Sequence, residues 1–413
     1  MLDSSALGAS AGSHPAMQFR FNSALKGKNM SVKSICKSLM LFALASSFAI
    51  TATAAETIKI GINVPLTGFA ASDGKSALNG AKLAAKQINN SGGILGKKLE
   101  LVVYDDQASP KQSVPIATKL IEKDKVTVGV SCSYSGATRA AAGIYQSAGV
   151  PYIAAYAIHP DITRAGDFVF RTSFVGEVQG RAGAKLAGDI LKKKRAVLIT
   201  LNNDFGKSLV AGFREKAGDY GITIVNEYPY SIKDRQFGPI VARVKADKPD
   251  VIYATGYYFT AGPLVTQLRT AGIKATIIGQ EGFDTQTFIE IAGAASEGVI
   301  ITTSLDRDSS SKETSDFIRE YEKMFNHKTD MVAASGHTAV KVAAAAIEHA
   351  GSTDRKKVRD NIARTKLVAS TGTISFNDLG EVIKDVQVQI VKDGQFRHFA
   401  VISDAKLLAP PTK

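Results

Sequence analysis

The chain has 413 residues, of which 45% are hydrophobic and 22% charged, a composition typical of globular proteins and a length sufficient for two well-buried domains. Its formal net charge of +13 does not indicate a nucleic-acid binder, because the basic residues are spread over expected helices, as at 192–195 and 355–357. No stretch after residue 55 reaches the roughly 18 apolar residues that a membrane-spanning helix requires.

The first 55 residues have the pattern of an export signal. The basic residues Lys33 and Lys37 precede an apolar run over 39–50, and the small residues at 52–55 offer a cleavage site. We therefore expect residues 1–55 to be a leader and signal peptide, and the mature protein to lie in the periplasm. A short membrane anchor is the alternative interpretation of the same segment.

Cysteine usage predicts a mature chain without an internal disulfide. Two cysteines occur, Cys36 and Cys132, and the first leaves with the leader. An exported protein with one thiol must be stabilised by its hydrophobic cores rather than by a disulfide framework. Because the leader carries five basic side chains and one acidic one, its removal lowers the formal net charge from +13 to +9.

Strands and helices alternate along the mature chain, a pattern that predicts an α/β fold with parallel sheets. Up to residue 230, strands are expected at 58–64, 99–104, 168–171, 196–201 and 223–228, helices at 76–89, 111–123, 179–191 and 207–219, and a strand, helix and strand within 126–160. The later expected helices are 238–246, 314–325, 333–350 and 355–364, and the late, partly antiparallel strands are 371–376, 386–391 and 398–402. Asp393-Gly394 is a hairpin signal between the last two.

One strand–helix–strand unit occurs twice, 123 positions apart. The copies run from Val126 to Pro160 and from Val251 to Phe283, and each has a small-residue turn after its first strand and an Ala-Gly stop after its helix. Open parallel sheets bind ligands beyond the carboxyl ends of their strands. Two copies offer two such edges, and two lobes that face each other could close on one small molecule.

Signals for catalysis and for cofactors are weak. The loop 68–76 resembles a phosphate-binding P-loop, but five residues separate its glycines where the P-loop has four. No dinucleotide-binding glycine pattern, nucleophile elbow or histidine–cysteine metal spacing is present in the sequence. Asp105 and Asp106 are neighbours on a strand and point to opposite faces, so they form no acid/base pair. We therefore predict that the protein is not an enzyme and has no cofactor.

Polar and aromatic residues gather at the expected strand ends. Ser133 lies between a strand and a helix, where its hydroxyl and nearby N–H groups can hold a ligand carboxylate; capping of its own helix is the alternative. Glu281, which matches Ile158 of the first unit, ends a strand of the second unit and suits a ligand ammonium, with an interlobe salt bridge as the alternative. Four aromatic residues could wall an apolar pocket or belong to the core: Tyr134, Tyr156, Phe205 and Tyr257.

Eight segments occur in a fixed order between Lys59 and about Val401: IGINVPLTG, ALNGAKLAAKQINNSGGILGKKLELVVYDD, AAAGIYQSAGVPYI, HPDIT, FVFRT, NDFGKS, DVIYATGYY and GQEGFD. In this order they resemble the leucine/isoleucine/valine-binding type of periplasmic solute-binding protein of ABC transporters. The resemblance implies a type I fold with two doubly wound parallel-sheet lobes and a three-strand hinge, near 171–172, 303–304 and 377–380. It also implies closure on a ligand and delivery to an inner-membrane ABC permease.

The resemblance also assigns roles to individual residues. It implies that Ser133 holds the ligand carboxylate, that backbone groups of Tyr156 and Ile158 contact the ligand, and that Tyr257 and Glu281 close from the second lobe.

Three positions depart from the pattern of the branched-chain amino-acid binders. Ile158 stands where those proteins usually have Thr, Asp73 where they have an aromatic residue, and Phe205 where they have Tyr. The site for the amino-acid backbone is therefore largely retained, while the pocket for the side chain differs.

Together these observations predict a monomeric periplasmic receptor for a small-molecule solute, an amino acid or a related compound, with no nucleic-acid partner. A ligand-sensing partner of a membrane signalling protein, and a receptor for another carboxylate or an amide, are the alternatives. The predicted domains are a leader (1–55), an N-terminal lobe (56–171 and 305–378), a C-terminal lobe (172–304 and 379–408) and a tail (409–413).

Overall fold

The computed structural model describes residues 56–413. The predicted leader and signal peptide lie outside the described residues. Among the helices of the described part, none is both long and apolar enough to cross a membrane.

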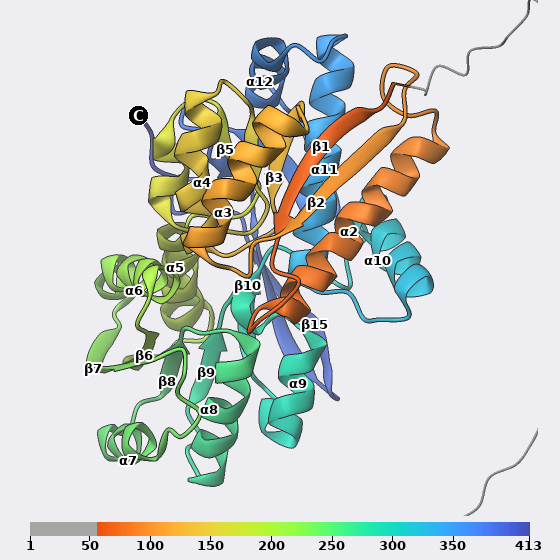
Figure 1. The fold of residues 1–413 in the computed structure, drawn as a ribbon. Coiled ribbons are helices and arrows are strands. Elements are labelled where there is room, and N and C mark those ends of the chain that lie inside the picture. Colours follow the sequence, from red (N-terminus) through yellow and green to blue (C-terminus); the bar gives the residue numbers. More distant parts are fainter. Residues whose placement is uncertain (1–55) are drawn as a thin grey trace, which may run out of the picture. The chain divides into compact units, whose positions relative to one another are not determined.

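A five-stranded parallel sheet is the centre of a first unit, which we call the N-terminal lobe (Figure 1). The β-branched residues of its strand β1 (Ile58–Val64) are buried, as is typical of parallel strands covered on both faces. The strands, in spatial order, are β2 (Leu99–Asp105), β1 (Ile58–Val64), β3 (Val128–Ser131), β4 (Tyr152–Ala154) and β5 (Val169–Arg171).

Helices cover both faces of this sheet. On β4, Tyr152 and Ala154 belong to one hydrophobic cluster and Ile153 to another, because neighbouring residues of a strand point to opposite faces. The first cluster lies under α3 (Pro110–Thr118) and α4 (Ser135–Ser147), which pack together. The second lies under α2 (Ala71–Asn90) and α11 (Met331–Ala350), and α10 (Lys312–Phe325) and α12 (Arg355–Ala363) complete the lobe.

A seven-stranded sheet is the centre of the second unit, the C-terminal lobe. Its strands, in spatial order, are β15 (Gln395–Ile402), β14 (Val386–Lys392), β10 (Ile300–Thr303), β9 (Thr276–Gly279), β8 (Val251–Ala254), β6 (Arg195–Leu201) and β7 (Thr223–Tyr230). The last five are parallel, and β14 and β15 form the predicted antiparallel hairpin across Asp393-Gly394. The helices are α5 (Gly176–Lys185), α6 (Asp204–Ala217), α7 (Gly238–Asp247), α8 (Tyr258–Thr270) and α9 (Gln286–Ala292).

The repeated unit is confirmed as the same structure in both lobes. It forms β3-α4-β4 in the N-terminal lobe and β8-α8-β9 in the C-terminal lobe. Gly149 and Gly272 end the two helices at φ values of 60° and 77°, a left-handed conformation that glycine adopts without strain. The strand ends of the two copies therefore carry equivalent residues.

The chain passes between the two sheets three times. It leaves the first sheet after β5 and returns to the N-terminal lobe after β10. Before entering β14 it forms a small antiparallel sheet of β11 (Leu367–Ala369), β12 (Gly372–Phe376) and β13 (Val382–Ile383). The residue limits of the two lobes stay a prediction.

Close packing of α2 on α11 gives a test of the fold. A Cβ atom at Gly80 would lie 1.9 Å from the carbonyl oxygen of Ala333, whereas one at Gly143 on α4 would meet nothing within 4 Å. We expect Gly80→Ala to destabilise the protein by about 1–3 kcal/mol through overpacking. Gly143→Ala, the matched helical control, should stabilise it by about 0.5–1 kcal/mol. Urea unfolding of both variants measures this, and equal effects would contradict the packing.

Candidate functional site

One small pocket is lined by residues of both lobes. Its cavity is about 20 Å³, room for roughly one water molecule, so the lobes close tightly around it in this structure. A solute of amino-acid size therefore requires the lobes to move apart. Six of the predicted site residues line it: Asp73, Tyr134, Tyr156, Phe205, Tyr257 and Glu281. The other lining residues are Ser135, Ala157, Gly282, Met331 and Val332.

A stack of aromatic rings crosses from one lobe to the other in this pocket. Tyr134 precedes α4 and Tyr257 precedes α8, so they are equivalent residues of the repeated unit. Their rings are stacked with centroids 4.4 Å apart and an interplanar angle of 3°. Phe205 of α6 stacks on the other side of Tyr257 at 4.7 Å. Ring faces of this kind suit a flat or apolar part of a ligand.

Two buried carboxyl groups face the pocket. Asp73, in the first turn of α2, accepts a hydrogen bond of 2.7 Å from the Tyr134 hydroxyl. Burial raises the pKa of Asp73 to about 7, against the hydrogen bond from Tyr134, which lowers it. Glu281 begins a short helix after β9, and its Oε1 accepts a hydrogen bond of 2.5 Å from Ser304. Its other oxygen, Oε2, is buried and has no hydrogen-bond partner among the described residues.

Ser133 and Ile158, the other two predicted site residues, are not among the residues that line this pocket, and their contacts with the ligand stay a prediction. The Ser133 hydroxyl donates to Asp106 at 3.0 Å, because that buried carboxylate needs donors and collects them from several side chains. The Ile158 N–H donates to the Ser135 hydroxyl at 3.2 Å. Ser135, two residues beyond Ser133, is therefore the serine at the pocket wall.

The start of α4 supplies positive potential to the same wall. The first N–H groups of a helix have no partner within the helix, and among the described residues no side chain caps α4. Ser135 is the first residue of this helix and lines the pocket. Unpaired helix N–H groups together with the helix dipole favour a bound anion.

Besides Ser135, four residues that line the pocket were not predicted from the sequence. Ala157 and Gly282 are sequence neighbours of predicted site residues, so the prediction missed each of them by one position. Met331 and Val332 begin α11, a helix that is distant in sequence from both repeated units. No local pattern could have placed that helix start at the pocket.

The thiol of Cys132 lies directly behind this wall. It is fully buried, Tyr156 donates a 2.5 Å hydrogen bond to its carbonyl oxygen, and burial raises the pKa of the thiol to about 12. A thiol that stays protonated and covered is unreactive. We expect residues 56–413 to react with a thiol reagent at one equivalent when denatured and negligibly when folded. Equal reaction rates in both states would contradict the burial of this residue.

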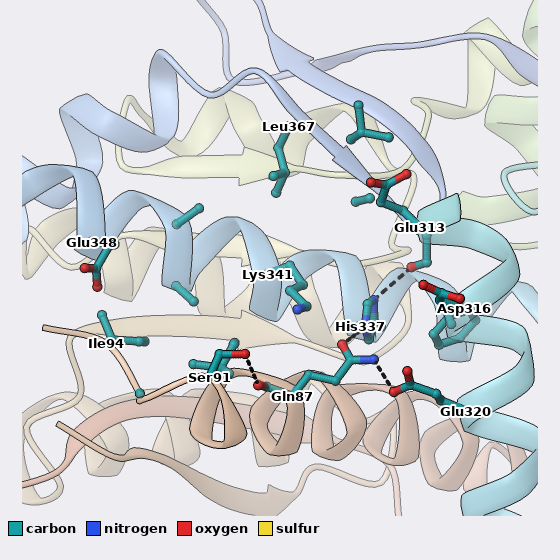
Figure 2. A pocket seen from close by; sticks show the side chains of 18 residues that line it. Gln87, Ser91, Ile94, Glu313, Asp316, Glu320, His337, Lys341, Glu348 and Leu367 are labelled. Carbon is teal, nitrogen blue, oxygen red and sulfur yellow. Dashed lines mark hydrogen bonds between the residues drawn. The ribbon is translucent and has the colours of Figure 1, made fainter. Parts of the chain in front are cut away.

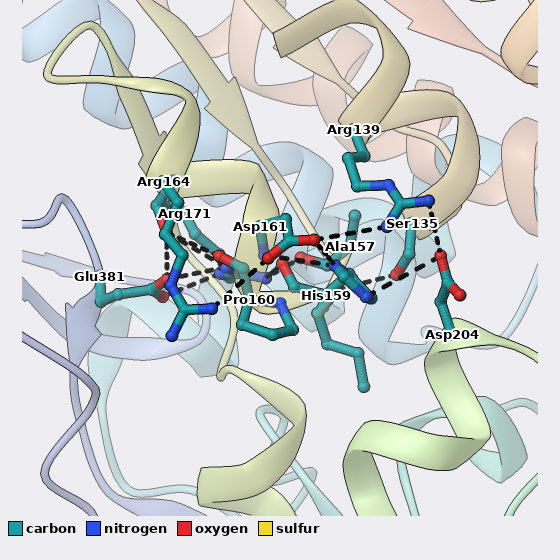
Figure 3. A network of polar contacts seen from close by, with 12 residues as sticks. Ser135, Arg139, Ala157, His159, Pro160, Asp161, Arg164, Arg171, Asp204 and Glu381 are labelled. Atoms are coloured by element: carbon teal, nitrogen blue, oxygen red, sulfur yellow. Dashed lines mark hydrogen bonds and ion pairs between the residues drawn. The ribbon is translucent and has the colours of Figure 1, made fainter. Parts of the chain in front are cut away.

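A polar network borders the pocket and reaches the hinge (Figure 3). Arg139 of α4 forms an ion pair of 3.1 Å with Asp204, the first residue of α6 in the other lobe. At the opposite end, Arg171 donates to both carboxylate oxygens of Glu381 and to the carbonyl oxygens of Ala157 and His159. The first contact joins the two lobes in the closed state, and the second holds the strand end that carries Ala157.

A larger cavity of about 620 Å³ lies within the N-terminal lobe alone, between α2, α10, α11 and β11 (Figure 2). Its buried His337 is hydrogen-bonded to Ser370 and Gln87, and Gln87 in turn donates to Glu320. Burial lowers the pKa of His337 to about 3, so its ring is neutral. None of the residues predicted to bind the solute lines this cavity.

The equivalent strand ends of the two lobes face one pocket. This arrangement defines the class of binding proteins that close on a solute. The profile of the family "Periplasmic binding protein" matches residues 57–395, and the chain belongs to this family. It is a non-enzymatic solute-binding protein of the kind that serves ABC transporters, with the type I fold of two parallel-sheet lobes.

Relatives with known names are similar over most of the chain. The leucine-, isoleucine-, valine-, threonine- and alanine-binding protein of Pseudomonas aeruginosa is 31% identical over 82% of this chain and 90% of its own length. A leucine-binding protein structure from Thermotoga maritima has 29% identity and a TM-score of 0.78, covering 84% of this chain and 99% of its own. A solute-binding protein from Rhodopseudomonas palustris in complex with 3,4-dihydroxybenzoic acid has 26% identity and a TM-score of 0.78, covering 84% and 98%.

Proposed function

We propose that this protein is a periplasmic receptor that captures a small carboxylate-bearing solute between its two lobes and delivers it to an inner-membrane ABC permease. An amino acid or amino-acid-like compound with an apolar or aromatic side chain is the proposed solute. The observation that carries the proposal is the convergence of six predicted residues from both lobes on one pocket.

Different walls of the pocket suit different parts of the solute. The uncapped start of α4 with the Ser135 hydroxyl is suited to the carboxylate of the solute. The stacked rings of Tyr134, Tyr257 and Phe205 are suited to its apolar or aromatic part. Glu281, one oxygen of which has no hydrogen-bond partner within residues 56–413, is suited to a hydrogen-bond donor on the solute.

An aromatic carboxylate without an amino group is the second candidate. The aromatic stack favours it, because the rings of Tyr134, Tyr257 and Phe205 can lie against the face of an aromatic ligand ring. The similar Rhodopseudomonas palustris protein is described as a complex with 3,4-dihydroxybenzoic acid.

A melting-temperature screen of the purified residues 56–413 tests the proposal. The panel contains aliphatic and aromatic amino acids, the corresponding 2-hydroxy acids, benzoates, and neutral amides as a comparison group. A ligand at 100 times its dissociation constant stabilises a protein by about 2.7 kcal/mol, which is a clear upward shift. Stabilisation by carboxylates supports the proposal, and a panel in which only compounds without a carboxylate shift the melt contradicts it.

A further inference from the structure

Asp73 lies at the tip of the Tyr134 side chain, at the opposite end of that ring from the start of α4. Its Oδ2 atom accepts the 2.7 Å hydrogen bond from the Tyr134 hydroxyl, whereas the backbone of Tyr134 directly precedes Ser135, the first residue of α4. Asp73 and Ser135 line the same pocket. The length of a tyrosine side chain therefore separates Asp73 from the wall that suits a carboxylate, and the Tyr134 ring, stacked on Tyr257, lies between them.

Asp73 is a buried acid without a charge partner. It is 8% exposed, it forms no ion pair within residues 56–413, and Tyr134 is its one hydrogen-bond donor among them. A second buried acid lies nearby, because Ser76, one turn further along α2, donates a 2.6 Å hydrogen bond to Asp330. Burying a carboxyl group in this way costs stability. The α2 dipole favours an acid in this turn, but the exposed position of Ser72 would serve it equally, so burial of the acid at the pocket points to a ligand.

A hydroxyl group at the far end of the solute suits Asp73. The carboxyl group of Asp73 accepts from a hydroxyl when it is ionised and donates to one when it is protonated, so a hydroxyl is paired in both states. A ligand ring that lies along the Tyr134 ring, with its carboxylate at the start of α4, has its opposite end beside Asp73. A site that bonds a ligand hydroxyl rejects the analogue without it, because its own buried polar group is then left unpaired.

We propose that Asp73 is a specificity-determining residue that binds a hydroxyl group at the end of the solute opposite its carboxylate, so that the receptor prefers 4-hydroxyphenyl acids to the corresponding phenyl acids. The proposal deepens the proposed function and rests on it for the position of the carboxylate. It assigns a polar group to the side-chain pocket, which the sequence predicts to differ from that of the branched-chain amino-acid binders.

Two pairs of probes test it: L-phenylalanine with L-tyrosine, and 3-phenylpropanoate with 3-(4-hydroxyphenyl)propanoate. Within each pair only the 4-hydroxyl group changes, and the two pairs differ in the α-ammonium. Titration calorimetry of the wild type should show roughly tenfold tighter binding, or more, of the hydroxylated probe. Asp73→Leu should abolish this preference, whereas Asp167→Leu, at an exposed position of the same lobe that does not line the pocket, should keep it. An unchanged preference in Asp73→Leu, or none in the wild type, overturns the proposal.

A second variant separates a direct contact from the positioning of Tyr134. Tyr134→Phe keeps the ring and removes the hydroxyl that donates to Asp73, so the preference for the hydroxylated probe should persist in it, whatever its overall affinity. A preference that is lost in Tyr134→Phe and kept in Asp73→Leu assigns the contact to Tyr134 and overturns the proposal.

Unfolding in urea without ligand tests the argument from burial. Asp73→Leu should not lower the unfolding midpoint, because it removes a buried acid without a charge partner; a lowered midpoint means that Asp73 stabilises the fold and counts against the proposal. If carboxylates stabilise the protein in the melting screen but neither hydroxylated probe binds more tightly than its partner, this inference fails and the proposed function stands. If no carboxylate binds, both fail.

Discussion

Glu281→Ala is expected to reduce the affinity for the captured solute by about 2–5 kcal/mol, the usual cost of removing one partner of a buried, charged hydrogen bond at an interface. The side chain is 3% exposed, lines the pocket, and has one oxygen without a partner in the described part of the chain. Titration calorimetry with the best ligand from the melting screen measures the loss.

Glu290→Ala is the matched control for this variant. Glu290 lies on α9 of the same lobe, is exposed, and does not line the pocket. Its affinity should equal that of the wild type. If Glu281→Ala also binds with wild-type affinity while its melting curve shows a folded protein, Glu281 does not contact the ligand.

Arg171→Met is expected to destabilise the protein by about 3–5 kcal/mol, because it leaves the Glu381 carboxylate buried without its partner. The two side chains are 0% and 1% exposed and joined by hydrogen bonds of 2.8 and 2.7 Å. Arg171 ends β5, the last strand before the first crossing, and its backbone N–H also donates to Gly380 beside the third. The pair therefore connects two hinge segments (Figure 3).

Two further variants separate charge burial from other causes. Lys356→Met breaks the exposed pair of Lys356 with Asp360, one turn apart on α12, and should cost at most about 0.5 kcal/mol. Arg171→Met combined with Glu381→Leu removes both buried charges and should recover much of the stability lost in the single variant. A single variant with wild-type stability would contradict the role of the pair.

The alternation of strands and helices and the internal repeat predicted two lobes built on parallel sheets, whereas the type I fold with its three crossings was implied by the family resemblance. Buried parallel strands such as β1 appear in the sequence as apolar runs, and Gly149 and Gly272 mark the ends of equivalent helices. These signals are local, so they can be recognised in the sequence without knowledge of tertiary packing. The repeat also predicts that Tyr134 and Tyr257 occupy equivalent positions, and their rings stack in the structure.

The site was less predictable, because the direction of a hydroxyl group and the approach of distant helices depend on tertiary contacts. Ser133 has the position that the resemblance implies, but its hydroxyl is directed to Asp106, a residue of the loop after β2. Met331 and Val332 line the pocket from the start of α11, a helix far from both repeated units in the sequence. No spacing rule connects that helix start with the repeated units, and only the return of the chain to the N-terminal lobe brings it to the pocket.

Small-angle scattering of residues 56–413, with and without saturating ligand, tests the central claim that the two lobes close on one solute. A ligand favours the closed form because that form lets both lobes contact it, whereas the open form offers one. The account predicts a smaller radius of gyration with ligand than without it. An unchanged radius of gyration, with binding confirmed by calorimetry in the same sample, would contradict it.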